Sequence, residues 1–158
     1  MPAKDNVREL DRAMHTARAW INDVARSVGT DDREFAYRVS RAWLHTLRDG
    51  LTVDAAAHFA AQLPDLLRGI FYANWNPATP SRRYGTDTFT NRFAEDANIS
   101  AHDVATVAPK VTAALLQHLP AELLEKALSQ FPRQVRLLLL PESSQGNELR
   151  RPEGSLRR

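Results

Sequence analysis

The chain of 158 residues contains no cysteine and only six glycines. Without cysteine it has no disulfide, no thiolate nucleophile and no cysteine-ligated zinc. So few glycines leave little material for a phosphate-binding loop, and neither a dinucleotide-binding fingerprint nor a nucleophile elbow occurs. These absences exclude several classes of enzyme, and we expect no cofactor.

Long apolar runs are also missing, because no stretch approaches the roughly 20 apolar residues that cross a bilayer. Residues 1–11 mix acids and bases without the apolar segment of a signal peptide, so we expect a cytoplasmic protein with no membrane partner. The pI is about 9.3, yet 21 basic residues nearly balance 19 acidic ones, leaving a net charge of +2. Net charge is therefore weak evidence for a nucleic-acid partner.

What the chain does contain is an internal duplication. Residues 62–68 (QLPDLLR) return as residues 130–136 (QFPRQVR), at an offset of 130 − 62 = 68 residues. Core-type residues match at the same offset over most of each copy, for example Val39 with Val107, Trp43 with Val111 and Leu47 with Leu115. The duplication predicts a repeated structural unit, and by itself it names no activity.

Within each copy the apolar residues recur at steps of three and four, as they do in amphipathic helices. We predict an all-α fold of two tandem four-helix repeats, about residues 5–72 and 87–140, packed as one helical domain. The expected segments are an N-terminal extension of the first helix (1–19), repeat 1 (20–72), a linker (73–86), repeat 2 (87–140) and a flexible, disordered C-terminal tail (141–158).

The first helix is expected to be long, from about residue 5 to residue 28, and to end at Gly29. Its apolar seam favours packing against the rest of the domain, whereas an exposed Trp20 leaves a dimerising helix as the alternative. In the second repeat Pro109 falls inside the helical pattern of residues 103–118 and removes an amide donor. We expect a kink or a late helix start there.

Several of these features together resemble a known family. They are the duplicated Gln-x-Pro turn with an arginine four residues after the proline, the linker residues Tyr72, Trp75 and Pro77, and the second copy that opens with residues 89–99. On these residues the chain resembles the bacterial family called domain of unknown function 2267, over roughly residues 20–140. The resemblance implies an all-helical fold of paired repeats and supplies no catalytic residue or ligand.

No residue pattern indicates catalysis or a metal site. The histidines lack metal-ligand spacing and are expected on solvated helix faces or near helix ends; they are His15, His45, His58, His102 and His118. The carboxylate pair Asp31 and Asp32 is better interpreted as helix caps than as an acid and base pair. We therefore expect a protein that is not an enzyme.

The duplicated turn has two interpretations. Its residues are Gln62, Pro64 and Arg68 in the first copy and Gln130, Pro132 and Arg136 in the second. Two equivalent corners would present arginine forks to anions. We favour a structural role, in which the glutamines bond backbone freed by the prolines and the arginines bond carbonyls at helix ends.

The linker and tail hold the candidate contacts to a partner or a nucleic acid. Trp75, Arg82, Arg83 and Tyr84 combine aromatic and guanidinium groups as single-stranded nucleic-acid sites do, although Trp75 would equally fill the groove between the halves. The tail adds the pairs Arg150 with Arg151 and Arg157 with Arg158.

Two functions follow as hypotheses. The first is a non-catalytic helical interaction or regulatory module, with a stress response as one setting and an unknown protein as the partner. The alternative is an RNA-, DNA- or ribosome-binding protein that uses the arginine-bearing linker and tail, and it predicts steep salt dependence. The oligomeric state is left open.

Overall fold

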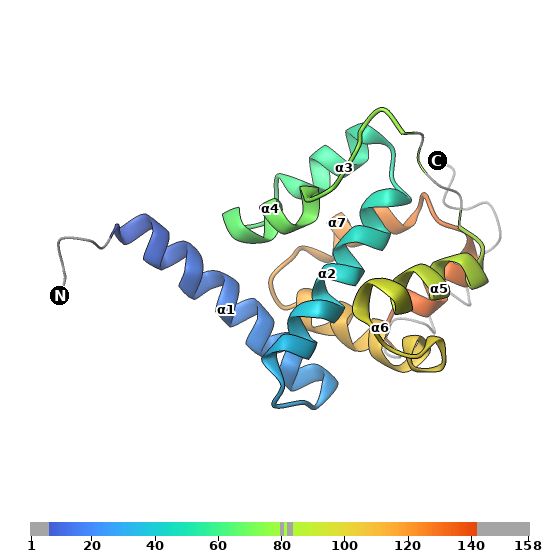
Figure 1. Cartoon of the computed structure of the whole chain (residues 1–158). Coiled ribbons are helices and arrows are strands. Elements are labelled where there is room, and N and C mark those ends of the chain that lie inside the picture. The colour runs from blue at the N-terminus through green and yellow to red at the C-terminus, as the bar shows by residue number, and fades with distance from the viewer. Residues whose placement is uncertain (1–6, 80, 82–83, 142–158) are drawn as a thin grey trace.

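A computed structural model describes residues 7–79, 81 and 84–141 of the chain, and the described residues form helices and no strand. This confirms the predicted all-α class. No described helix combines the length and the apolar character that crossing a bilayer requires. The helices, shown in Figure 1, are α1 (Arg8–Val28), α2 (Arg33–Asp49), α3 (Val53–Ala60), α4 (Asp65–Tyr72), α5 (Thr86–Ala97), α6 (Ala101–Leu115), α7 (Ala121–Leu128) and α8 (Arg133–Leu139).

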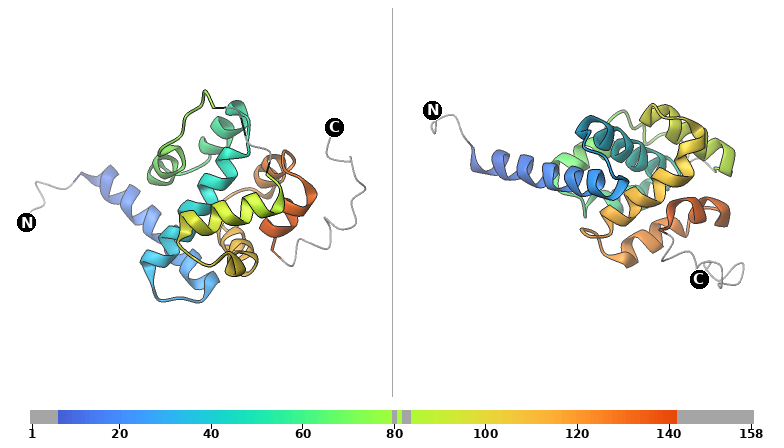
Figure 2. Two further views of the ribbon diagram at one scale, coloured as in Figure 1. Left: turned by 45° about the vertical axis from the view of Figure 1, so that its right-hand side comes forward. Right: turned by 90° about the horizontal axis from the view of Figure 1, so that it is seen from below.

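The two halves of the chain are interleaved. The most extensive helix contacts join α2 to α5 and α1 to α6, so the first helix of each half packs on the second helix of the other. The short fourth helices also correspond, because α4 packs on α2 as α8 packs on α6. The left view of Figure 2 shows α5, in yellow-green, crossing α2. This arrangement is compatible with two four-helix repeats packed as one domain.

The core is continuous across both halves. Trp43 of α2 is fully buried, with an exposed fraction of 0%, and its indole N–H donates to the hydroxyl of Thr112 on α6 at 2.8 Å. A buried indole N–H needs such an acceptor, because leaving it without one costs about 1–3 kcal/mol. The helix pair that forms the middle of the domain is therefore joined by a polar contact as well as by apolar packing.

The duplicated turns close each half in the same way. Arg68 donates to the carbonyls of Ala60 at 3.1 Å and Leu63 at 2.7 Å, and Arg136 donates to the carbonyl of Phe131 at 2.6 Å. These carbonyls lie at or just after the end of a helix, where acceptors lack their usual intrahelical amide partners, although the Ala60 carbonyl also accepts from the amide of Leu63 at 3.0 Å. Each arginine thus holds the turn that precedes its own helix.

The glutamines of the two turns are not equivalent. The Gln130 side chain accepts from the backbone amide of Thr52 at 3.1 Å, so it links the second half to the start of α3. Gln62 is exposed. The prediction was that each glutamine side chain bonds a backbone group left without a partner by the nearby proline. Neither Gln62 nor Gln130 forms such a bond in the described structure.

Helix starts follow the local sequence. Asp32 caps α2 by accepting from the amide of Phe35 at 3.1 Å, so the cap is Asp32 rather than Asp31. Ser100 caps α6, which begins at Ala101. Pro109 therefore lies in the interior of α6, and the alternative of a late helix start is wrong.

Two expectations about exposure are also wrong. Trp20 is buried rather than exposed, because its ring stacks on His118 with centroids 4.5 Å apart. His118 in turn contacts the carboxylate of Asp23 at 2.7 Å. The apolar periodicity of residues 53–63 predicts that Val53 lies in the core, but Val53 is exposed, while Phe59 on the same helix is buried. The segment between α6 and α7 covers Trp20, and this contact spans almost a hundred residues of sequence.

Candidate functional site

The linker after α4 places its aromatic residues in different environments. Trp75 is half-buried and stacks on Tyr72, with ring centroids 5.3 Å apart. Asn74, immediately before it, has a left-handed backbone with φ of 62°, which turns the chain sharply. The indole is thus held against α4 by stacking and by the turn.

Tyr84 does not join Trp75. Its exposed fraction is 2%, and its ring packs edge-on against Phe89 and parallel to Phe131 at 5.8 and 6.2 Å. A ring enclosed in this way cannot stack on a base or a partner, so its assignment as a contact residue was wrong. The physical reason is that the end of the linker passes over the second half and fills its core.

The predicted arginine contacts are not placed. Arg82, Arg83, Arg150, Arg151, Arg157 and Arg158 all lie outside the described residues. The nucleic-acid hypothesis therefore stays a prediction, and Tyr84 is no longer among its contact residues.

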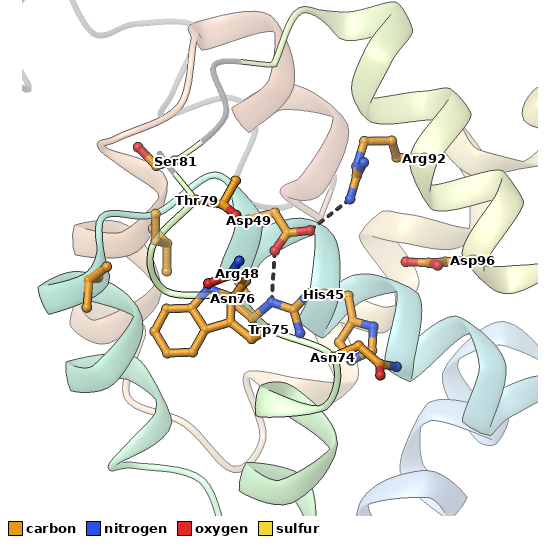
Figure 3. A pocket seen from close by; sticks show the side chains of 12 residues that line it. His45, Arg48, Asp49, Asn74, Trp75, Asn76, Thr79, Ser81, Arg92 and Asp96 are labelled. Atoms are coloured by element: carbon orange, nitrogen blue, oxygen red, sulfur yellow. Dashed lines mark hydrogen bonds and ion pairs between the residues drawn. The ribbon is translucent and has the colours of Figure 1, made fainter.

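A polar cavity of about 330 Å³ lies between the end of α2, the linker and α5. In Figure 3, His45, Arg48 and Asp49 extend from α2, while Arg92 and Asp96 extend from α5 on the other side. Trp75 forms part of the wall. None of the four charged residues was predicted as a site residue.

Arg48 is the buried centre of this cavity wall. Its side chain is 6% exposed, and Nη1 donates to the carbonyls of Phe71 and Ala73, each at 2.8 Å. Its Nε donates to Asp49 Oδ1 at 2.8 Å. A buried guanidinium is tolerated only when such partners replace its lost hydration. Arg48 therefore ties the end of α4 and the start of the linker to α2.

Asp49 bridges the two halves of the cavity. One carboxylate oxygen accepts from Arg48 and the other from Arg92 Nη2 at 2.8 Å. The Arg92 guanidinium also lies over the ring of Tyr84, 5.9 Å from its centroid. Asp96, four residues further along α5, lines the same cavity, and its carboxylate forms no hydrogen bond or ion pair with a described residue.

His45 is buried, which corrects the expectation that every histidine is solvated. Its Nε2 lies 2.7 Å from the carbonyl of Ile70 and must carry a proton to donate there. Burial lowers the pKa of His45 below its ordinary value, despite the opposing effect of that hydrogen bond. The imidazole is thus neutral at pH 7, with Nδ1 as its acceptor.

A second feature is the N-terminal half of α1, which extends beyond the body of the domain (Figure 2). Val7, Leu10 and Met14 are 54%, 67% and 45% exposed. They continue the seam of Ala17 and Ile21, which do pack against the core. We call Val7, Leu10 and Met14 the exposed stripe.

The comparison with known families bears on both features. The family described as "Uncharacterized conserved protein (DUF2267)" matches residues 17–138, which is most of the chain. The chain belongs to the DUF2267 family. This confirms the resemblance found in the sequence. A comparison with curated proteins found no match.

The polar cavity and the exposed stripe differ in their position relative to the DUF2267 match. Every residue that lines the polar cavity falls within residues 17–138, whereas the exposed stripe precedes the match. The cavity thus belongs to the matched DUF2267 region, and the stripe lies before it in the chain.

The sequence held weak signals for the cavity residues. Arg92 and Asp96 are four residues apart and so share a face of α5. Arg48 and Asp49 end α2 with opposite charges. That these two pairs face each other depends on the packing of α2 against α5, which no local pattern specifies.

Proposed function

We propose that this protein is a non-catalytic, cytoplasmic interaction module, and that its exposed stripe binds an amphipathic helix of a partner protein. The observation that carries the proposal is the continuation of one apolar seam past the edge of the domain. In its C-terminal half the seam packs on α6. In its N-terminal half Leu10 and Met14 have the same spacing and no such cover in the described structure.

The geometry favours a helix as the occupant. Residues 7, 10 and 14 follow the steps of three and four by which one helix packs on another. A partner helix that lies along α1 would extend the packing that α6 provides further along the same face. Its own sequence should therefore show apolar residues at steps of three and four.

The absence of cysteine makes a clean test possible. A photoreactive cross-linker is attached to Leu10→Cys on the stripe and, as the matched control, to Arg12→Cys on the opposite face of the same helix. The expected result is a protein cross-linked from the Leu10 position in extract of the native cell and not from the Arg12 position. A synthetic helix from that protein should bind the purified chain, and Leu10→Gln with Met14→Gln should weaken binding by about tenfold or more.

Three outcomes would contradict the proposal. Equal cross-linking from both positions would mean that the stripe has no selectivity. Cross-linking of the purified chain to itself would make a second copy the occupant. Unchanged affinity in the double variant would place the partner elsewhere on the molecule.

A further inference from the structure

The polar cavity carries a separate inference, which does not depend on the exposed stripe. Among the described residues, its wall contains two guanidinium groups, Arg48 and Arg92, and two carboxylates, Asp49 and Asp96. The ring of His45 adds no charge at pH 7, because burial lowers its pKa. The part of the wall that the structure describes is therefore balanced in charge, and there an anion or a cation alone would meet as many like charges as opposite ones.

Arg48 offers a fixed donor at one side of the cavity. Three hydrogen bonds from Nε and Nη1 hold the guanidinium in place. Among the described residues, Nη2 has no hydrogen-bond partner. A donor that is already immobilised loses little entropy when it binds an acceptor such as a carboxylate.

Asp96 offers a carboxylate on the other side. Its backbone carbonyl accepts from Arg41 at 3.0 Å, which fixes this end of α5 against α2. Its carboxylate extends from α5 in the close view of Figure 3 and forms no hydrogen bond or ion pair with a described residue, although it acts electrostatically on Arg92 and His45. An ammonium group would supply this carboxylate with the hydrogen-bond donors that no described residue gives it.

Size and shape limit the ligand further. The cavity volume of about 330 Å³ falls at the small end of the range for ligand sites. The indole of Trp75, which stacking on Tyr72 holds in place, gives the cavity one apolar wall. A small molecule with both charges and a short apolar portion matches these surfaces.

We propose that the cavity binds a small zwitterion of the free α-amino acid class. The ammonium group lies on Asp96, and the carboxylate lies toward Arg48 and Arg92. The side chain of the ligand lies against Trp75.

The test is calorimetric titration of the full chain at low ionic strength with each standard L-amino acid in turn. The one that binds most tightly is then compared with its decarboxylated amine and its deaminated acid. Both analogues should bind about tenfold more weakly or worse, since each lacks one charged hydrogen-bonding group. Asp96→Asn should reduce affinity for the zwitterion by a similar factor and leave that for the deaminated acid unchanged.

Glu95→Gln is the matched control, because Glu95 is the preceding carboxylate of α5, is exposed and does not line the cavity. It should leave affinity unchanged. Circular dichroism of both variants checks that the fold is retained. The proposal is overturned if no amino acid saturates the chain below about 10 mM, if the amine binds as tightly as the zwitterion, or if Glu95→Gln weakens binding as much as Asp96→Asn.

Discussion

Replacing Thr112 by valine should destabilise the domain by removing the acceptor for the indole of Trp43. The Thr112 hydroxyl donates to the carbonyl of Ala108 at 3.1 Å, so its oxygen is what receives the indole N–H at 2.8 Å. Valine keeps the shape and leaves that N–H buried without an acceptor. The expected cost is about 1–3 kcal/mol in the free energy of unfolding.

The hydrogen bond between Trp43 and Thr112 also predicts an energetic coupling between substitutions at these two residues, which apolar packing alone does not predict. Trp43→Phe removes the donor and leaves a small cavity, at a cost of about 1–2 kcal/mol. In that background Thr112→Val no longer leaves a buried donor unpaired, so its further cost should fall below about 0.5 kcal/mol. A double-mutant cycle should therefore give a coupling energy of about 1–2 kcal/mol.

Urea unfolding of the four proteins, followed by far-ultraviolet circular dichroism, measures this coupling. Thr46→Val is the matched control, because Thr46 is equally buried and its hydroxyl bonds only carbonyls of its own helix. It should couple to Trp43→Phe by less than about 0.5 kcal/mol. A coupling for Thr112 no larger than that of the control would refute the role assigned to the hydrogen bond.

Two further predictions concern a glycine and an ion pair. Gly50→Ala should destabilise by about 1–3 kcal/mol, since the new Cβ would lie 2.3 Å from the buried ring of Phe131. Gly69 lies inside α4 and has open space around the position of a Cβ, so Gly69→Ala should stabilise by about 0.5–1 kcal/mol. Urea midpoints that move in the same direction would contradict this. Burial acts to raise the pKa of Asp23, but hydrogen bonds, including that from His118, outweigh it and lower the pKa below 3.8. Because the folded-state pKa is the lower one, the ionised carboxylate stabilises the fold fully above 3.8 and loses that effect as the pH falls through the lowered value. Unfolding measured against pH should show the advantage of the native chain over Asp23→Asn shrinking below this point, and an advantage that stays constant in acid would count against it.

Local periodicity was sufficient to predict the helices. The steps of three and four correctly indicated the helical segments of the described residues, because each helix buries one stripe of its own sequence. The offset of 68 residues is compatible with the arrangement of these helices in two sets. Helix ends were less accurate. The apolar pattern predicts that α3 ends near Leu63 and α7 near Phe131, but they end at Ala60 and Leu128, because the chain turns ahead of each proline.

Exposure could not be predicted where distant segments meet. Trp20 is buried by His118, and Tyr84 is buried by Phe131. His45 lies inside because α2 is surrounded by α4, α5, α6 and α1. The polar cavity was missed for the same reason, since its charged residues come from two helices and a linker. The exposure of such residues depends on how helices and linkers pack against one another, and a local sequence pattern does not determine this packing.

Because α1 packs on α6 and α5 packs on α2, each half of the chain covers the first helix of the other half. These contacts are compatible with two similar four-helix halves that pack on each other and are joined by a linker. A chain cut within residues 73–84 would give two fragments, each lacking the surface that covers its own first helix. Such fragments would recover their structure by binding one another, as the halves of a split protein do.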